Sequence, residues 1–202
     1  MLGSREVEGP ILFQGFKDKL EGQFLSFKYG KKKVLDSISI EIKKNQIVGI
    51  IGESGSGKTT LVNLITGLLE PQHGAILLDG MSLKEINTIS YRNRIGYIAQ
   101  EPVIFTDSLY NNITFRAPKT DQILAKFWAV IEKTHLRSFI NGLPEGEDTL
   151  LGDNGILISG GQKQRISIAR ELFKDVEILV MDEATSALDS ETESVIQSNL
   201  DD

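Results

Sequence analysis

The segment 52–59 has the residue types and spacing of a phosphate-binding loop. It reads Gly52-Glu53-Ser54-Gly55-Ser56-Gly57-Lys58-Thr59 and fits the pattern G-x-x-x-x-G-K-[ST]. Gly55 and Gly57 permit backbone turns that other residues resist, so that successive N–H groups can point at phosphate oxygens. Lys58 can neutralise the β- and γ-phosphates, and Thr59 can offer its hydroxyl to Mg²⁺. The residues predicted to bind a nucleotide here are Gly52, Ser54, Gly55, Ser56, Gly57, Lys58, Thr59 and Thr60.

Two adjacent carboxylates form a second candidate for chemistry. Asp182 and Glu183 directly follow the apolar run Val176–Met181. Ligands of open α/β sheets bind where strands end, so both side chains are placed for a reaction. Asp182 is suited to hold Mg²⁺, generally through water, and Glu183 to activate an attacking water as general base. The simpler alternative is a strand followed by an acidic helix cap.

The elements around these residues have the pattern of an α/β protein. Ile47–Ile51 is a continuous apolar run, which predicts a strand buried on both faces directly before the loop. Apolar residues from Leu61 to Leu68 are spaced i, i+3, i+4 and i+7, which predicts a helix that Pro71 closes. Val176–Met181 predicts a further buried strand. Strands that alternate with helices favour an α/β layered core.

Other segments predict an antiparallel portion and several helices. Phe24–Tyr29 and Val34–Ile42 alternate apolar and polar residues, as half-buried antiparallel strands do, with Lys31–Lys33 as a solvated hairpin tip. Residues 121–140 are expected to form a helix capped by Thr120 or Asp121.

The ends of the chain leave two further interpretations. Residues 1–20 are either partly an expression linker or, at Pro10–Phe13, a native first strand. A helix is expected after Ser159, and Ser190 with Glu193 predicts a capping box that opens a last helix.

Composition places the chain among ordinary globular proteins. Of its 202 residues, 40% are hydrophobic and 25% charged, which argues against disorder. With no cysteine, it has neither disulfides nor thiolate metal ligands. A net charge of −6 disfavours a nucleic-acid partner. Its apolar runs are too short for a membrane span of about 20 residues, so we expect the isolated chain to be soluble.

The segment Ile158–Arg165, which reads ISGGQKQR, resembles the signature motif of ATP-binding-cassette (ABC) ATPases. The family usually has Leu where Ile158 stands. The resemblance implies that this helix start binds the γ-phosphate of a nucleotide held by a second protomer, so that ATP joins two domains head to tail. The residues implied in that role are Ser159, Gly160, Gly161 and Gln162.

Three more residues match elements of the same family in the expected order. Tyr29 resembles the aromatic residue that stacks on adenine, and Gln100 the glutamine that contacts Mg²⁺ and links to a membrane domain. Asp189 resembles the aspartate of the loop that crosses the dimer interface. The resemblance thus implies ATP and Mg²⁺ as cofactors, with Glu183, Lys58 and Gln100 as catalytic residues.

The implied fold is one ABC ATPase domain with a RecA-like P-loop NTPase core. Residues 1–100 and 171–202 would form an N-terminal antiparallel β subdomain and the core, and residues 101–170 an inserted α-helical subdomain. Val103–Ile113 and Leu143–Gly155 resemble exporter-type segments. The implied function is ATP hydrolysis for an exporter or flippase, at the cytoplasmic face of the inner membrane. The implied partners are a membrane domain fused upstream and a second nucleotide-binding domain, expected to form a homodimer; a non-identical partner stays open, as does the transported substrate.

One family element has no match. The family carries a histidine downstream of the loop that contains Asp189, but the only histidines here are His73 and His135. We therefore expect a fragment that lacks the C-terminal part of the domain, binds nucleotide and hydrolyses it weakly. The alternative is a soluble ABC-type ATPase of the DNA-repair or translation class. A repair-type head would need a long heptad insertion between Thr59 and Ser159, which is absent, and translation-type cassettes normally occur in tandem.

Overall fold

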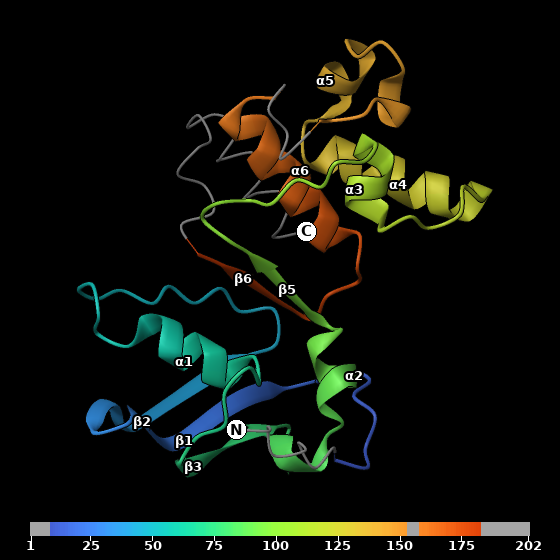
Figure 1. Ribbon diagram of the computed structural model, residues 1–202. Coiled ribbons are helices and arrows are strands. Elements are labelled where there is room, and N and C mark those ends of the chain that lie inside the picture. Colours follow the sequence, from blue (N-terminus) through green and yellow to red (C-terminus); the bar gives the residue numbers. More distant parts are fainter. Residues whose placement is uncertain (1–8, 153–157, 183–202) are drawn as a thin grey trace. The chain divides into compact units, whose positions relative to one another are not determined.

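The computed structural model describes residues 9–152 and 158–182. These divide between Ile95 and Gly96 into two compact units (Figure 1). The first contains, in chain order, β1 (Lys19–Tyr29), β2 (Lys32–Lys43), α1 (Lys58–Ile65), β3 (His73–Leu78), β4 (Met81–Ser82), the 3-10 helix η1 (Leu83–Glu85) and α2 (Thr88–Arg92). From the boundary onward follow β5 (Ile95–Ile98), α3 (Leu109–Thr114), α4 (Asp121–Lys133), α5 (Arg137–Asn141), the 3-10 helix η2 (Gly146–Asp148), α6 (Gly160–Leu172) and β6 (Ile178–Met181).

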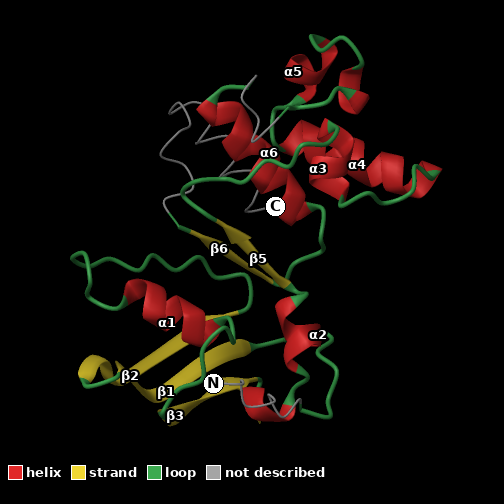
Figure 2. Ribbon diagram, in the orientation of Figure 1, coloured by secondary structure: helices red, strands yellow, loops and turns green. Residues whose placement is uncertain are grey.

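The first unit is built on a four-stranded antiparallel sheet in the order β2-β1-β3-β4. Leu20 of β1 is paired with Ile42 of β2 on one side and with Leu78 of β3 on the other. The predicted antiparallel hairpin is thus confirmed, with Lys31–Lys33 exposed at its tip. Alternate residues are buried along much of β1, and α1 contacts β2 (Figure 2). The buried apolar side chains of these elements are Leu20, Leu25, Phe27, Leu35, Leu61, Leu64, Ile65, Ile76 and Leu78.

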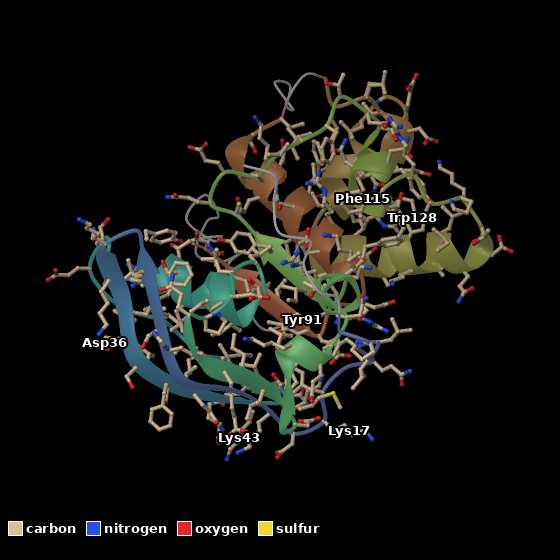
Figure 3. The ribbon with its side chains drawn as sticks, turned by 60° about the horizontal axis from the view of Figure 1, so that its bottom comes forward. Lys17, Asp36, Lys43, Tyr91, Phe115 and Trp128 are labelled. Atoms are coloured by element: carbon tan, nitrogen blue, oxygen red, sulfur yellow. The ribbon has the colours of Figure 1, made fainter. Side chains whose placement is uncertain are left out.

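The N-terminal segment packs on this unit without forming a strand. Ile11 makes a single bridge to Ile86, and Phe13 packs edge to face on Tyr91 with ring centroids 5.1 Å apart. Tyr91, labelled in Figure 3, is completely buried, and its hydroxyl donates to the Ile65 carbonyl at 2.7 Å. Of the two interpretations of residues 1–20, a regular first strand at Pro10–Phe13 is therefore not seen; residues 1–8 lie outside the described part of the chain.

The prediction of a buried strand at Ile47–Ile51 is wrong. Within the described residues this segment pairs with no strand, and Ile47 and Ile51 are 80% and 98% exposed. A continuous apolar run shows a preference for burial, but a strand also needs a neighbour that satisfies its main-chain N–H and C=O groups. The apolar run itself does not specify that neighbour.

The helix after the loop is also shorter than predicted. It ends at Ile65, and Gly67 follows with φ +69° while its N–H donates to the Leu64 carbonyl. A left-handed glycine after the last turn is a common helix stop, so the helix ends before Pro71 is reached. Leu68 consequently lies outside the helix and is 53% exposed.

The second unit is mainly helical around one apolar core, beside the two-stranded β5–β6 sheet (Figure 2). α4 begins after Thr120, whose hydroxyl accepts the Ile123 N–H, and this decides between the two predicted caps. The core residues are Ile104, Leu109, Tyr110, Ile113, Phe127, Val130, Ile131, Leu136, Ile140, Leu151, Ile166, Ala169 and Phe173.

The single helix predicted over 121–140 is in fact two, α4 and α5. Thr134 ends α4, His135 has φ +54°, and the Leu136 N–H donates to the Ile131 carbonyl at 3.1 Å. This is the pattern of a Schellman-type helix end, accompanied by burial of the apolar residue that follows. Leu136 is fully buried, so tertiary packing of its side chain favours the break.

Two further expectations can be compared with the part of the chain that the structure describes. The predicted capping box at Ser190 and Glu193 lies outside it. Among the described residues, no helix combines the length and the apolar character that crossing a membrane requires.

Candidate nucleotide-binding site

The loop before α1 has the backbone geometry of an anion cradle. Gly55 and Gly57 have φ +78° and +100°, as expected from their place in the motif. A Cβ on Gly57 would lie 3.0 Å from Leu35 Cδ2, and one on Gly52 would lie 2.7 Å from Ser56 Oγ. The left-handed backbone at Gly55 and Gly57 therefore favours glycine at these two positions, and the lack of a side chain at Gly52 leaves room for Ser56.

The start of α1 supplies the positive groups of the cradle. Gly57 is its N-cap, so within this described segment no side chain caps the first N–H groups of the helix. Those N–H groups and the helix dipole favour an anion. The ammonium of Lys58 donates to the carbonyls of Gly52 and Glu53, at 2.8 and 3.0 Å, which keeps it beside the loop. Thr59 is exposed and Thr60 is buried.

Tyr29 lies at the end of β1 and is 52% exposed. Its ring packs edge to face on Phe27, with centroids 4.9 Å apart and planes at 74°. One side of its aromatic ring is thereby supported, while much of its area stays available for stacking.

The magnesium-binding candidates of the second unit follow its two strands. Gln100 comes two residues after β5 and Asp182 directly after β6; both are exposed. The main-chain N–H of Asp182 donates to the Ile98 carbonyl at 3.0 Å, which joins the two strand ends. Because β5 and β6 are paired, Tyr97 and Asp182 come into contact although they are 85 positions apart. The Tyr97 hydroxyl donates to Asp182 Oδ2 at 3.1 Å.

The start of α6 is a capped and exposed helix end. Ser159 Oγ accepts the Gln162 N–H at 3.2 Å, and Gln162 Oε1 accepts the Ser159 N–H at 2.8 Å. This reciprocal capping box fixes the turn, while the Ser159 hydroxyl keeps its own proton to donate. Ser159 and Gly160 are exposed, and Gly161 is half-buried.

The chemistry of the residues present fits Mg·ATP. The loop offers N–H donors and an ammonium, which match phosphate oxygens. Among the described residues there is no cluster of three His, Asp or Glu side chains that could enclose a metal. Magnesium in nucleotide sites needs only one or two carboxylates together with substrate phosphates, so the hydroxyl of Thr59 and the carboxylate of Asp182 are suitable ligands. Glu183 and Asp189 lie outside the described residues.

Sequence reasoning missed two groups of the second unit. Tyr97 was not assigned a role, although its place three residues before Gln100 could have suggested one. Arg170 was also missed: it is only 7% exposed and donates to the carbonyls of Asn112 and Val103, at 2.7 and 2.9 Å. In the sequence, the signal is a charged arginine on the face of this helix that is otherwise expected to be apolar.

The fold and these residues define a P-loop ATPase domain with an antiparallel β-sheet and helices that carry a signature segment. The sequence matches the model of the ABC transporter family over residues 35–186. The chain belongs to this family.

Individual relatives agree with that assignment. An "ATP-dependent lipid A-core flippase" of Ralstonia nicotianae is 42% identical over 185 residues, which are 90% of this chain and 31% of the relative. "Multidrug resistance protein 4" of Entamoeba histolytica is 41% identical over 193 residues, which are 94% of this chain and 15% of the relative. The chain spans at most about a third of the length of these curated relatives.

A solved structure shares the fold. The chain aligns with the structure titled "Structure of a bacterial Atm1-family ABC exporter with ATP bound" with a TM-score of 0.85 and 32% identity. The alignment covers 98% of this chain and 34% of that one. The predicted P-loop NTPase fold with an antiparallel β portion is thus confirmed.

Proposed function

We propose that this chain is the ATP-binding and ATP-hydrolysing domain of an exporter or flippase. The observation that carries the proposal is the exposed start of α6, where Ser159 and Gly160 face solvent on a fixed turn. An anion-binding helix end of this kind can receive the γ-phosphate of a nucleotide on a second copy. The names of the relatives, a lipid A-core flippase and a multidrug resistance protein, support the transport class.

In this proposal catalysis consists of positioning and charge neutralisation. Tyr29 stacks on adenine, while the loop amides and Lys58 bind the phosphates. Thr59, Gln100 and Asp182 hold Mg²⁺, which when bound draws charge from the phosphate oxygens. Glu183, assigned from sequence, activates the attacking water.

The proposed assembly is a head-to-tail pair. Ser159, Gly160, Gly161 and Gln162, together with Asp189, would contact the nucleotide or the interface of the partner domain. ATP then stabilises the pair, and hydrolysis removes the bridging phosphate. A membrane domain on the same polypeptide, at the cytoplasmic face of the inner membrane, would convert pairing into transport.

The test separates binding from pairing. Lys58→Ala should abolish ATP affinity because the phosphates lose their ammonium, whereas Ser159→Arg should leave ATP affinity intact and prevent ATP-dependent association. Titration calorimetry measures the first property and light scattering the second. Lys31→Ala, which removes an exposed ammonium at the hairpin tip, is the control and should change neither. Equal loss of ATP binding in Lys58→Ala and Ser159→Arg would contradict the division of roles.

A further inference from the structure

Tyr97 forms a side-chain hydrogen bond with the proposed magnesium ligand Asp182. The two residues belong to adjacent strand ends, β5 and β6, within the second unit. The phenol hydroxyl donates to Asp182 Oδ2 at 3.1 Å, and the Asp182 N–H donates to the Ile98 carbonyl at 3.0 Å. The main chain and the side chain of Asp182 are therefore both tied to β5.

The position of Tyr97 is itself fixed by its neighbours. Its N–H donates to Glu171 Oε2 at 3.4 Å, and Glu171 is 5% exposed on α6. Lys174 Nζ donates to both carboxylate oxygens of Glu171, at 2.9 and 2.7 Å, which balances its charge. At Gly96 a Cβ would lie 2.8 Å from Leu179 Cδ1, so the backbone beside Tyr97 packs tightly on β6. The main chain that carries Tyr97 is thus held in place on β6 and α6.

The hydrogen bond matters because the exposed carboxylate of Asp182 could otherwise rotate. The terminal torsion of aspartate is broad, so an unsupported side chain samples many orientations. Mg²⁺ demands near-ideal octahedral geometry and loses affinity when a ligand is displaced. Partners that hold a metal ligand by hydrogen bonds commonly set its orientation.

We propose that Tyr97 is a positioning residue that orients the Asp182 carboxylate for Mg²⁺. The proposal rests on the proposed function, since it takes Asp182 as a ligand of the magnesium that accompanies ATP. Tyr97 contacts neither nucleotide nor metal in this role. The Tyr97 hydroxyl donates a hydrogen bond to one oxygen of the Asp182 carboxylate and so fixes the direction in which the other oxygen points.

The variant Tyr97→Phe tests this, because it removes the hydroxyl and keeps the ring. We expect the magnesium concentration that gives half of the full effect on ATP affinity to rise about tenfold, as for other partners of metal ligands. ATP affinity measured in EDTA should be unchanged, since the phosphate loop is untouched. Binding of Mn²⁺ to the ADP complex, followed by electron paramagnetic resonance, should weaken by the same factor.

Tyr110→Phe is the matched control. The Tyr110 hydroxyl donates to the Ala117 carbonyl at 3.1 Å in the same unit, so this variant also removes one phenol hydrogen bond. It should leave both the magnesium dependence and the ATP affinity in EDTA as in wild type. A comparable change in both variants would overturn the proposal, because loss of either hydroxyl would then act through general destabilisation.

A double-mutant cycle with Asp182→Asn completes the test. If Tyr97 acts through Asp182, Tyr97→Phe should add nothing to the loss caused by Asp182→Asn. Additive effects would overturn the proposal, as would an unchanged magnesium dependence in Tyr97→Phe or an equal loss of ATP affinity with and without magnesium. A wild-type chain that binds no nucleotide would instead refute the proposed function and, with it, the inference that depends on it.

Discussion

At the scale of single residues, Lys58 illustrates how the loop is prepared for a phosphate. Its ammonium donates to two neutral carbonyls, those of Gly52 and Glu53. A phosphate oxygen is a charged acceptor and forms a stronger, charge-assisted bond with the same ammonium. The carbonyl contacts therefore keep the side chain next to the cradle and can be exchanged for phosphate contacts.

The carboxylate of Asp107 accepts hydrogen bonds from several neighbouring groups. Asn111 Nδ2 and the Ser108 N–H donate to its Oδ1, both at 2.8 Å, and Arg116 Nε donates to its Oδ2 at 2.8 Å. The hydrogen bond from Asn111, followed by those from Arg116 and Ser108, lowers the pKa of this carboxyl to about 2. The charged form thus stabilises the start of α3, where Ser108 is the N-cap.

The lowered pKa of Asp107 predicts a pH-dependent contribution to stability. A carboxyl whose pKa is lowered by folding stabilises the native state above its unfolded pKa, and the effect is lost as pH falls through the folded pKa. Asp107→Asn should therefore lower the free energy of unfolding at pH 7. Its difference from wild type should shrink between about pH 4 and pH 2. Urea denaturation at a series of pH values measures this, and a difference that is constant over that range would contradict it.

At the scale of elements, α1 depends on the glycine that precedes it. Gly57 has φ +100°, and a Cβ there would meet Leu35 and Val34 of β2. The glycine therefore serves both the backbone turn of the loop and the close approach of α1 to the sheet.

Gly57→Ala should consequently weaken ATP binding as well as folding. We expect a loss of at least about 1–2 kcal/mol in the free energy of unfolding from backbone strain. ATP affinity should fall too, because relief of the contact with β2 shifts the loop. Gly80→Ala is the control: its φ is +82°, but nothing lies within 4 Å of the added Cβ. It should lower stability and leave ATP affinity unchanged. Titration calorimetry measures the ATP affinity of both variants. Equal affinities would show that the contact of residue 57 with β2 does not affect ATP binding.

Polar groups cap the first turn of α6 and join its end to a neighbouring segment. Its first turn carries the capping box of Ser159 and Gln162, and near its end Arg170 donates to the carbonyls of Asn112 and Val103. The guanidinium also lies 5.8 Å from the ring of Phe115, which Figure 3 labels. Because arginine can hold two carbonyls at once, α6 and the segment 103–112 are joined as one packed body.

At the scale of the whole molecule, nucleotide binding should appear as added stability. A ligand that binds only the folded chain at a concentration of 100 times its Kd raises the free energy of unfolding by about 2.7 kcal/mol. We expect this shift for wild type in Mg·ATP and none for Lys58→Ala. Chemical denaturation with and without the nucleotide measures it. A similar shift in both proteins would place the binding site elsewhere.

Features that depend on neighbouring residues could be predicted from the sequence alone. The phosphate loop, a helix cap at Thr120 or Asp121, a helix start after Ser159 and the hairpin of β1 and β2 were all predicted. Each rests on hydrogen bonds or side-chain periodicity within a few residues, so a short stretch of sequence contains all of its partners.

Features whose partners are distant in the chain became visible only in the folded structure. Ile47–Ile51 is apolar enough for a buried strand, yet strand formation requires a neighbour that the run does not specify. The helix predicted over 121–140 breaks where Leu136 enters the core. The bond from Tyr97 to Asp182 joins residues 85 positions apart. Pairing and burial of this kind depend on which segments contact each other in the folded chain, and the local sequence does not specify those contacts.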